Sequence, residues 1–360
     1  MSPLVVDQRR RAAVAALCAL ATTTAAIWLA ADPGDDSIRP RAALFAAPSA
    51  VVADAGRSPA RKRLSLGWHG GQLVAVSGEQ VTVYVSDAYP PEQVSPQAWA
   101  NFFAGLLHDD EIRLATIRIA APSEVTELCG PHALGCYGAN ELVVGGDVVN
   151  GVTPQSIARH EYGHHLATHR RNPPWRALDW GPKRWATVED VCRRTASRTA
   201  FPADNGDNYR LDPAEAFAEA YRAANEIRAG MPLGWSLVDG SFYPDAAALD
   251  AVVQDASVPW SAPTQQKFAR RFTATGPRRL LVPVTLPLDG EVVVELRLPA
   301  GRIDELELVT PDGSTVLARG LWSSTTTRRL AYVACGLRSA AVRVTRKGSP
   351  GRLTLTVSRP

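Results

Sequence analysis

The residues best suited to chemistry stand together in one short segment, His160-Glu161-Tyr162-Gly163-His164. On a helix, four residues turn about 400°, so the rings of His160 and His164 project from nearly the same face, one turn apart. Two imidazoles placed in this way can bind a single Zn²⁺ ion. In this pattern Glu161 does not bind the metal; it takes a proton from a metal-bound water. The segment therefore predicts a zinc site with a general base beside it.

A chance cluster of surface histidines is the alternative interpretation. Histidine is rare in this chain, at 7 of 360 residues, and the pattern also requires a helix. Helix signals are present, because Thr153 is a good N-cap and Pro154 suits the first helical position, so we expect a helix from Thr153 to about His169. His165 and His169 point about 140° and 180° away from His160. We expect both to be solvated or satisfied by local hydrogen bonds.

A second expected helix, Asp212 to Ala229, carries a further pair of candidate residues. Glu215 and Glu219 are again four residues apart and share a face. The alternative is that Asp212 and Glu215 form a capping box, with Glu219 a solvated charge. Zinc needs a third protein ligand and an open fourth position, and a glutamate on a later helix is a usual source of that ligand.

With these two segments the chain resembles the gluzincin class of metallopeptidases, most closely long-spacer members such as anthrax lethal factor. The resemblance rests on residues 160–164 and 214–220, within a layout that covers residues 64–262. It implies that Glu215 is the third zinc ligand and that Glu219 orients a ligating histidine. It also implies that Tyr209 stabilises the oxyanion. The family has such a tyrosine shortly before the glutamate helix, and the spacing in this chain differs by one residue. The spacer between His164 and Glu215 is much longer than that of thermolysin.

Two further features bear on this class of protein. The metzincin class requires Gly and His where this chain has Ala167 and Arg170, so that class is excluded. The run from Asn140 to Val149 looks like the edge strand on which such enzymes lay an extended substrate. Three tryptophans lie in the loop-rich segment that follows the first helix, and they either wall a substrate cleft or pack in the core: Trp175, Trp180 and Trp185.

Four cysteines follow the N-terminal region: Cys129, Cys136, Cys192 and Cys335. An even number in an exported chain predicts two disulfides, for which three pairings exist. We favour Cys129 with Cys136, which closes a small loop, and this leaves Cys192 to join Cys335. Metal binding is the alternative, but the chain has no Cys-x-x-Cys spacing.

The N-terminal residues 1–31 have the pattern of an export signal. A basic triplet, Arg9 to Arg11, precedes an uncharged run from Ala12 to Ala31. The segment is either cleaved or retained as a membrane anchor, and in both cases the rest of the chain would face outward. A buried Ala-rich helix is the alternative. Residues 32–63 are rich in Pro, Ala and charge and predict a disordered linker.

From residue 277 to residue 360 the chain changes to short alternating runs separated by turn signals such as Pro311-Asp312-Gly313. About seven strands at this spacing predict an all-β sandwich. The expected fold is thus an α+β zincin-like catalytic domain at 64–262 followed by a β-sandwich accessory domain at 277–360. The net charge of +3, without a long basic run that interleaves aromatics, argues against a nucleic-acid partner.

These features together predict an exported zinc-dependent endopeptidase, secreted or membrane-anchored, that acts on protein or peptide substrates. The alternative is a catalytically silent zinc-containing surface protein that binds through its C-terminal sandwich. Glu161 argues against this alternative, because a set of ligands alone does not need that carboxylate. A third hypothesis makes the sandwich the functional module, docking to a cell-surface carbohydrate or protein. Its sequence shows no distinct site, so an accessory role in packing or targeting is expected.

Overall fold

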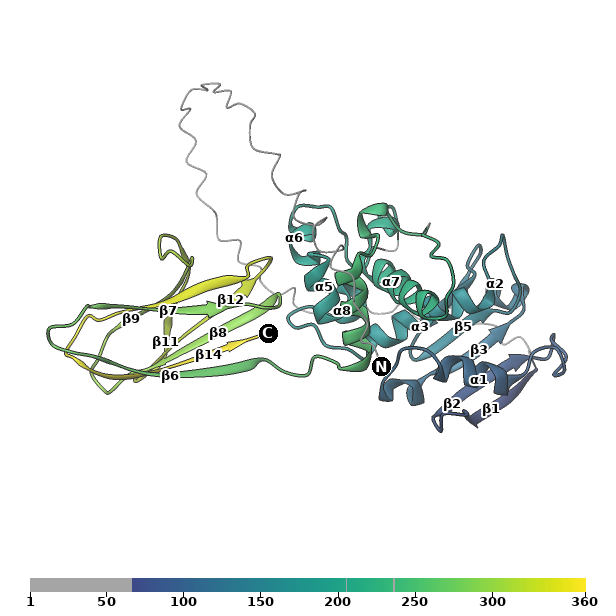
Figure 1. The fold of residues 1–360 in the computed structure, drawn as a ribbon, viewed down its shortest axis with the longest axis horizontal. Helices are drawn as coiled ribbons and strands as arrows, with labels where there is room; N and C mark the ends of the chain where they lie inside the picture. The colour runs from purple at the N-terminus through teal and green to yellow at the C-terminus, as the bar shows by residue number, and fades with distance from the viewer. Residues whose placement is uncertain (1–66, 205, 236) are drawn as a thin grey trace, which may run out of the picture. The chain divides into compact units, whose positions relative to one another are not determined.

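The structure is a computed structural model that describes residues 67–204, 206–235 and 237–360. The expected export signal at 1–31 and linker at 32–63 lie outside the described residues. The described residues belong to one compact unit. This unit is mixed α/β, with helices around a first sheet and two antiparallel sheets in the C-terminal part (Figure 1).

The first sheet has the strand order β1-β2-β3-β5-β4. Strands β2, β3 and β5 are parallel, and β1 and β4 are antiparallel to their neighbours. The prediction that Asn140–Val149 is an edge strand is wrong. The strand in this segment is β5, which lies inside the sheet between β3 and β4. Helices α2 and α3 both contact it, and its continuous apolar run is typical of such an interior strand. The strands are β1 Trp68–Val74, β2 Gln80–Ser86, β3 Thr116–Ala120, β4 Gly135–Gly138 and β5 Glu141–Gly145.

Four helices of this part, α1, α3, α7 and α8, begin after a residue whose side chain accepts from a backbone N–H of the first turn. Helix α3 contacts β4, β5 and α7, and α7 also contacts α8. The α-helices are α1 Pro96–Ala104, α2 Pro122–Cys129, α3 Pro154–Thr168, α4 Ala177–Trp180, α5 Lys183–Val188, α6 Val191–Ala196, α7 Pro213–Arg228 and α8 Ala246–Ser257. Short 3-10 turns lie at η2 Asp110–Leu114, η3 Tyr209–Leu211 and η4 Gly240–Phe242.

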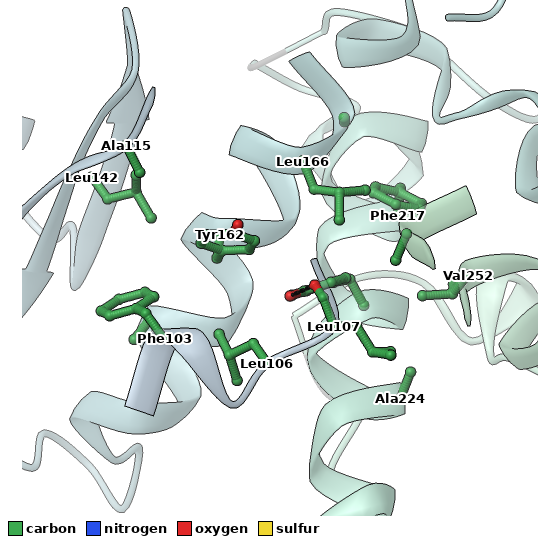
Figure 2. Packing of buried hydrophobic residues seen from close by; sticks show 14 of the residues in the cluster. Phe103, Leu106, Leu107, Ala115, Leu142, Tyr162, Leu166, Phe217, Ala224 and Val252 are labelled. Carbon is green, nitrogen blue, oxygen red and sulfur yellow. Dashed lines mark hydrogen bonds between the residues drawn. The ribbon is translucent and has the colours of Figure 1, made fainter. Parts of the chain in front are cut away.

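A hydrophobic core fills the space between the sheet and these helices. Tyr162 of α3 packs against Phe103 of α1, and Leu166, one turn later, lies beside Phe217 of α7 (Figure 2). Burying a side chain of this size stabilises a fold by about 1.5–3 kcal/mol. The core thus holds α3 and α7 side by side, and these are the two helices that carry the candidate ligands.

The C-terminal part consists of two antiparallel sheets, with strand orders β10-β9-β13-β7 and β11-β12-β8-β14-β6. Inward side chains of both sheets share one core, as in a β-sandwich. Two strands had no sequence prediction: β6 Thr264–Phe272 and β11 Leu321–Ser324. The other strands are β7 Arg279–Thr285, β8 Gly290–Arg297, β9 Glu305–Val309, β10 Val316–Arg319, β12 Thr327–Ala334, β13 Ser339–Thr345 and β14 Gly351–Arg359.

Two disulfides join Cys129 to Cys136 and Cys192 to Cys335. This is the favoured pairing, and disulfides are typical of proteins that leave the reducing cytosol. They therefore suggest an extracellular or secreted protein. Within the residues that the structure describes, no helix has the length and apolar character needed to cross a bilayer.

Candidate metal centre

Helices α3 and α7 begin at well-capped residues, and these starting points set the positions of the candidate ligands. The Thr153 side chain accepts from the backbone N–H of Ser156 at 3.2 Å, and Pro154 occupies the first turn of α3. Asp212 accepts from the backbone N–H of Ala214 at 2.9 Å at the start of α7. Since the Glu215 carboxylate instead meets a histidine, Asp212 and Glu215 do not form a capping box.

Gly163 lets the two helices approach closely. A Cβ built on this residue would lie 2.7 Å from the Cα of Ala218 in α7. Because the obstructing atom is backbone, no side-chain rotation could relieve the contact. Only glycine at this position allows α7 to lie where Glu215 reaches the histidines of α3.

We therefore expect Gly163→Ala to push α3 and α7 apart. Overpacking of this kind destabilises a protein by about 1–3 kcal/mol, and the separation would also weaken metal binding by moving Glu215 away from His160. Urea denaturation and a Co²⁺ titration measure the two effects. Gly240→Ala is the matched control, because a Cβ there meets no atom within 4 Å. Equal behaviour of the two variants would contradict the expectation.

The imidazoles of His160 and His164 converge on the Glu215 carboxylate. Nε2 of His160 lies 3.2 Å from Oε2 of Glu215 and 3.3 Å from Nε2 of His164. Nε2 of His164 lies 3.6 Å from the same Glu215 oxygen. All three side chains are buried. This group could hold a metal ion, since one ligand atom from each residue lies within 4.8 Å of the others.

Glu219 and Arg222 continue the centre on the other side of His160. Oε2 of Glu219 lies 3.2 Å from Nδ1 of His160. Arg222 donates to both oxygens of Glu219, from Nε at 2.9 Å and from Nη2 at 2.6 Å. A carboxylate on the second nitrogen of an imidazole fixes the ring's orientation and leaves Nε2 to face a ligand. Glu219 thus orients His160, and Arg222 holds Glu219 in place.

The histidine and the two carboxylates of this group shift one another's pKa values. Burial alone would lower the pKa of His160, but hydrogen bonds to Glu215 and Glu219 raise it to about 10. Burial alone would raise the pKa of Glu219, but His160 and Arg222 lower it to about 2. Burial alone would also raise the pKa of Glu215, but the two imidazoles hold it well below its usual range. Both carboxylates therefore stay ionised, and the charge of Glu215 favours a cation beside the two imidazoles.

Glu161 lies on the same turn of α3 as the ligands, against strand β4. A Cβ built on Gly135 of β4 would lie 3.0 Å from Oε1 of Glu161. Burial raises the pKa of this carboxyl above its usual value. A raised pKa is typical of a carboxylate that accepts and returns a proton near neutral pH.

The Tyr209 hydroxyl donates to Oε2 of Glu215 at 2.7 Å. Burial and the Glu215 charge raise the pKa of this tyrosine, so the hydroxyl keeps its proton and remains a donor. The structure therefore brings Tyr209 to the candidate ligands from η3, just before α7.

The other residues weighed from the sequence lie away from this centre. His165 is fully buried rather than solvated. Its Nε2 lies 2.9 Å from the backbone oxygen of Glu111, which is far from it in the sequence, so the hydrogen bond is not local. Trp185 belongs to the core. Trp180 packs against this core, and the half-buried Trp175 stacks on Trp180 with ring centroids 4.9 Å apart.

Sequence reasoning missed two residues of the centre, Arg222 and Gly135. Arg222 had a signal, because it stands three residues after Glu219 and such pairs are neighbours on a helix. Gly135 had none, since it lies inside the disulfide loop, where no strand was expected.

Comparisons with known proteins add little to this geometry. No protein-family model matches the chain, and no curated protein matches it. Among solved structures, the pre-peptidase C-terminal domain of a collagenase from Bacillus anthracis is similar at 11% identity, with 26% of this chain and 88% of that chain covered and a TM-score of 0.23. A periplasmic inhibitor of g-type lysozyme from Aeromonas hydrophila is similar at 10% identity, with 27% and 85% covered and a TM-score of 0.19. TM-scores this low carry no argument about fold or function.

Proposed function

We propose that this protein is a zinc-dependent endopeptidase of the gluzincin type, with a zincin-like catalytic part formed by the first sheet and its helices. The observation that carries the proposal is the convergence of His160, His164 and Glu215. A tetrahedral Zn²⁺ ion with ligands at 2.0–2.1 Å holds them about 3.3 Å apart, and the three distances here are 3.2, 3.3 and 3.6 Å. Two imidazoles and one carboxylate are a usual ligand set of catalytic zinc.

Zinc bound here would act as a Lewis acid and make a water molecule nucleophilic at neutral pH. The remaining steps belong to the protein. Glu161 takes the water's proton on its carboxylate and passes it to the leaving amine. The Tyr209 hydroxyl, which donates to Glu215, would donate instead to the oxyanion that forms when the peptide carbonyl is attacked.

Strand β4 is the part of the sheet that suits an extended peptide. It stands at the end of the strand order beside β5, and an exposed edge can pair with a substrate backbone. Gly135 places this strand against Glu161, so a peptide paired with β4 would pass close to the general base. The disulfide between Cys129 and Cys136 holds the strand at its start.

A catalytically silent zinc protein that binds through its sandwich is the second candidate. It would keep the ligand set and have no use for the buried Glu161 or for Tyr209 beside the ligands. These two side chains favour hydrolysis over simple binding.

The test is metal analysis of the purified full chain together with digestion of an unstructured protein such as reduced casein. We expect about one zinc per chain, casein cleavage that a chelator abolishes, and recovery when Zn²⁺ is restored. Zinc without cleavage would favour the silent binding protein. A chain with neither zinc nor Zn²⁺ affinity would overturn both candidates.

A further inference from the structure

Charge is divided unevenly between the two parts of the chain. Residues 64–263 contain 14 Lys+Arg and 24 Asp+Glu, whereas residues 264–360 contain 16 Lys+Arg and 7 Asp+Glu. The net charge of the whole chain is therefore small because the charges of a strongly basic C-terminal sandwich and of a strongly acidic part at residues 64–263 largely cancel. Asymmetry of this kind suggests that one part interacts with a polyanion.

The positive charge gathers at one end of the sandwich. Strand registers place three segments there, because Phe272 pairs with Gly351, Arg297 with Thr354, and Thr345 with both Arg279 and Glu305. We call residues 270–279, 297–305 and 345–352 the basic end. The opposite end of the strands meets the helical part through the Cys192–Cys335 disulfide and the Lys183–Asp289 hydrogen bond. The basic end thus lies away from that junction.

The two acidic residues at the basic end, Asp304 and Glu305, are paired with other residues than its exposed arginines. Asp304 is fully buried and pairs with Arg302, and Glu305 pairs with Lys347 at 3.2 Å. No carboxylate in the described part of the chain forms a salt bridge with the exposed arginines of the basic end, which are Arg270, Arg271, Arg278, Arg279, Arg297 and Arg352.

Two of these arginines face each other directly. Arg271 of β6 stands opposite Arg352 of β14, on the outer face of the sheet. Like charges in such a position destabilise a strand pair. Arg297 lies on the same face, one row further along. A small hollow at this place is lined in part by Arg270, Arg271 and Arg279. An external anion would relieve the repulsion between Arg271 and Arg352.

Buried contacts hold this arrangement in place. Arg302 donates to the backbone oxygen of Arg352 at 3.1 Å. The buried Arg346 donates to the backbone oxygen of Thr273. These two hydrogen bonds hold the backbone at the start of β14 and in the turn after β6. The exposed arginines in these segments are therefore attached to a well-positioned backbone.

We propose that the basic end binds a linear polyol phosphate, a polymer of repeating phosphodiester groups that carries no bases. Arginine presents a planar fork of N–H donors that binds phosphate in a bidentate manner, whereas the ammonium of lysine acts as a point charge. Phe272, the aromatic residue of the basic end, is buried. In the same sheet, the guanidinium of Arg328 on β12 lies over the ring of Trp322 on β11, 4.3 Å from its centroid, which leaves little aromatic surface for stacked bases. Ile303 is the exposed large hydrophobic residue of this end, which gives little apolar area for insertion into a bilayer. The proposal stands independently of the proposed peptidase activity.

The test is binding of the full chain to a fluorescent poly(glycerol phosphate), followed by anisotropy in 50 and 200 mM NaCl. We expect saturable binding that weakens about tenfold or more at the higher salt concentration. The double variant Arg271→Gln with Arg352→Gln should weaken binding about tenfold, since it removes two phosphate contacts.

Arg176→Gln with Arg193→Gln is the matched control. It removes the same charge from side chains that are 75% and 74% exposed on the helical part, and it should leave affinity within twofold of the unmodified chain. Equal losses in the two double variants would overturn the proposal, because net charge alone would then explain binding. Stronger binding to phosphatidylglycerol vesicles or to duplex DNA than to the polymer would overturn it too, as would no binding in 50 mM NaCl.

Discussion

Glu161→Gln is expected to retain its metal and to lose peptide hydrolysis by about 10²–10⁴-fold, the usual contribution of a positioned general base. The amide has nearly the shape of the carboxylate, so the contact with Gly135 of β4 survives. It cannot accept the proton that the attacking water must lose. The variant therefore separates proton transfer from metal binding.

The measurement is kcat/KM on a fluorogenic peptide, with metal content determined on the same samples. Glu127→Gln is the control, because Glu127 is exposed on α2 and takes no part in the centre. A Glu161→Gln chain with unchanged turnover would exclude Glu161 as the base. Loss of metal in that chain would instead make Glu161 a ligand.

Glu215→Ala is expected to lower metal affinity by more than about 100-fold. Loss of a residue that only orients a ligand usually weakens metal binding by 10–100-fold, and Glu215 is placed to contact the ion itself. Glu219→Gln and Arg222→Gln should show the smaller loss of metal affinity expected of orienting residues in the same protein, because both side chains act through the ring of His160. Competition against a chromogenic chelator gives the three affinities.

The order of the three affinities distinguishes a ligand from a supporting residue. We expect the greatest loss at Glu215, a smaller loss at Glu219 and the smallest at Arg222. A Glu215→Ala chain that binds metal as the unmodified chain does would remove this residue from the ligand set. Urea unfolding of the metal-free variants checks that each still folds.

Local signals predicted the helices that carry the candidate centre. Thr153 and Pro154 mark the start of α3, and Asp212 with Pro213 marks the start of α7. Side chains four residues apart on these helices must share a face. The sequence could therefore predict which residues face the centre, whereas the distance between the two helices depends on packing at Gly163 and on the core around it.

Strand order was the part that local patterns could not predict. The run that contains Leu142 and Val143 had a clear strand signal, but its place inside the sheet depends on pairing with β3 and β4. The edge strand beside β5, Gly135–Gly138, is only four residues long and contains two glycines and a cysteine, so it has no strand periodicity. The polar strand β6 was missed for a related reason, because most of its side chains are exposed.

The disulfide between Cys192 and Cys335 has a consequence for a chain that is cut. Its two cysteines are 143 residues apart, and the segment between them includes α7, α8 and most of the sandwich. A single backbone break anywhere in that segment leaves both pieces covalently joined. One cleavage in that segment, including a cut that the protein makes in itself, therefore cannot release the sandwich until a reductant opens the bridge.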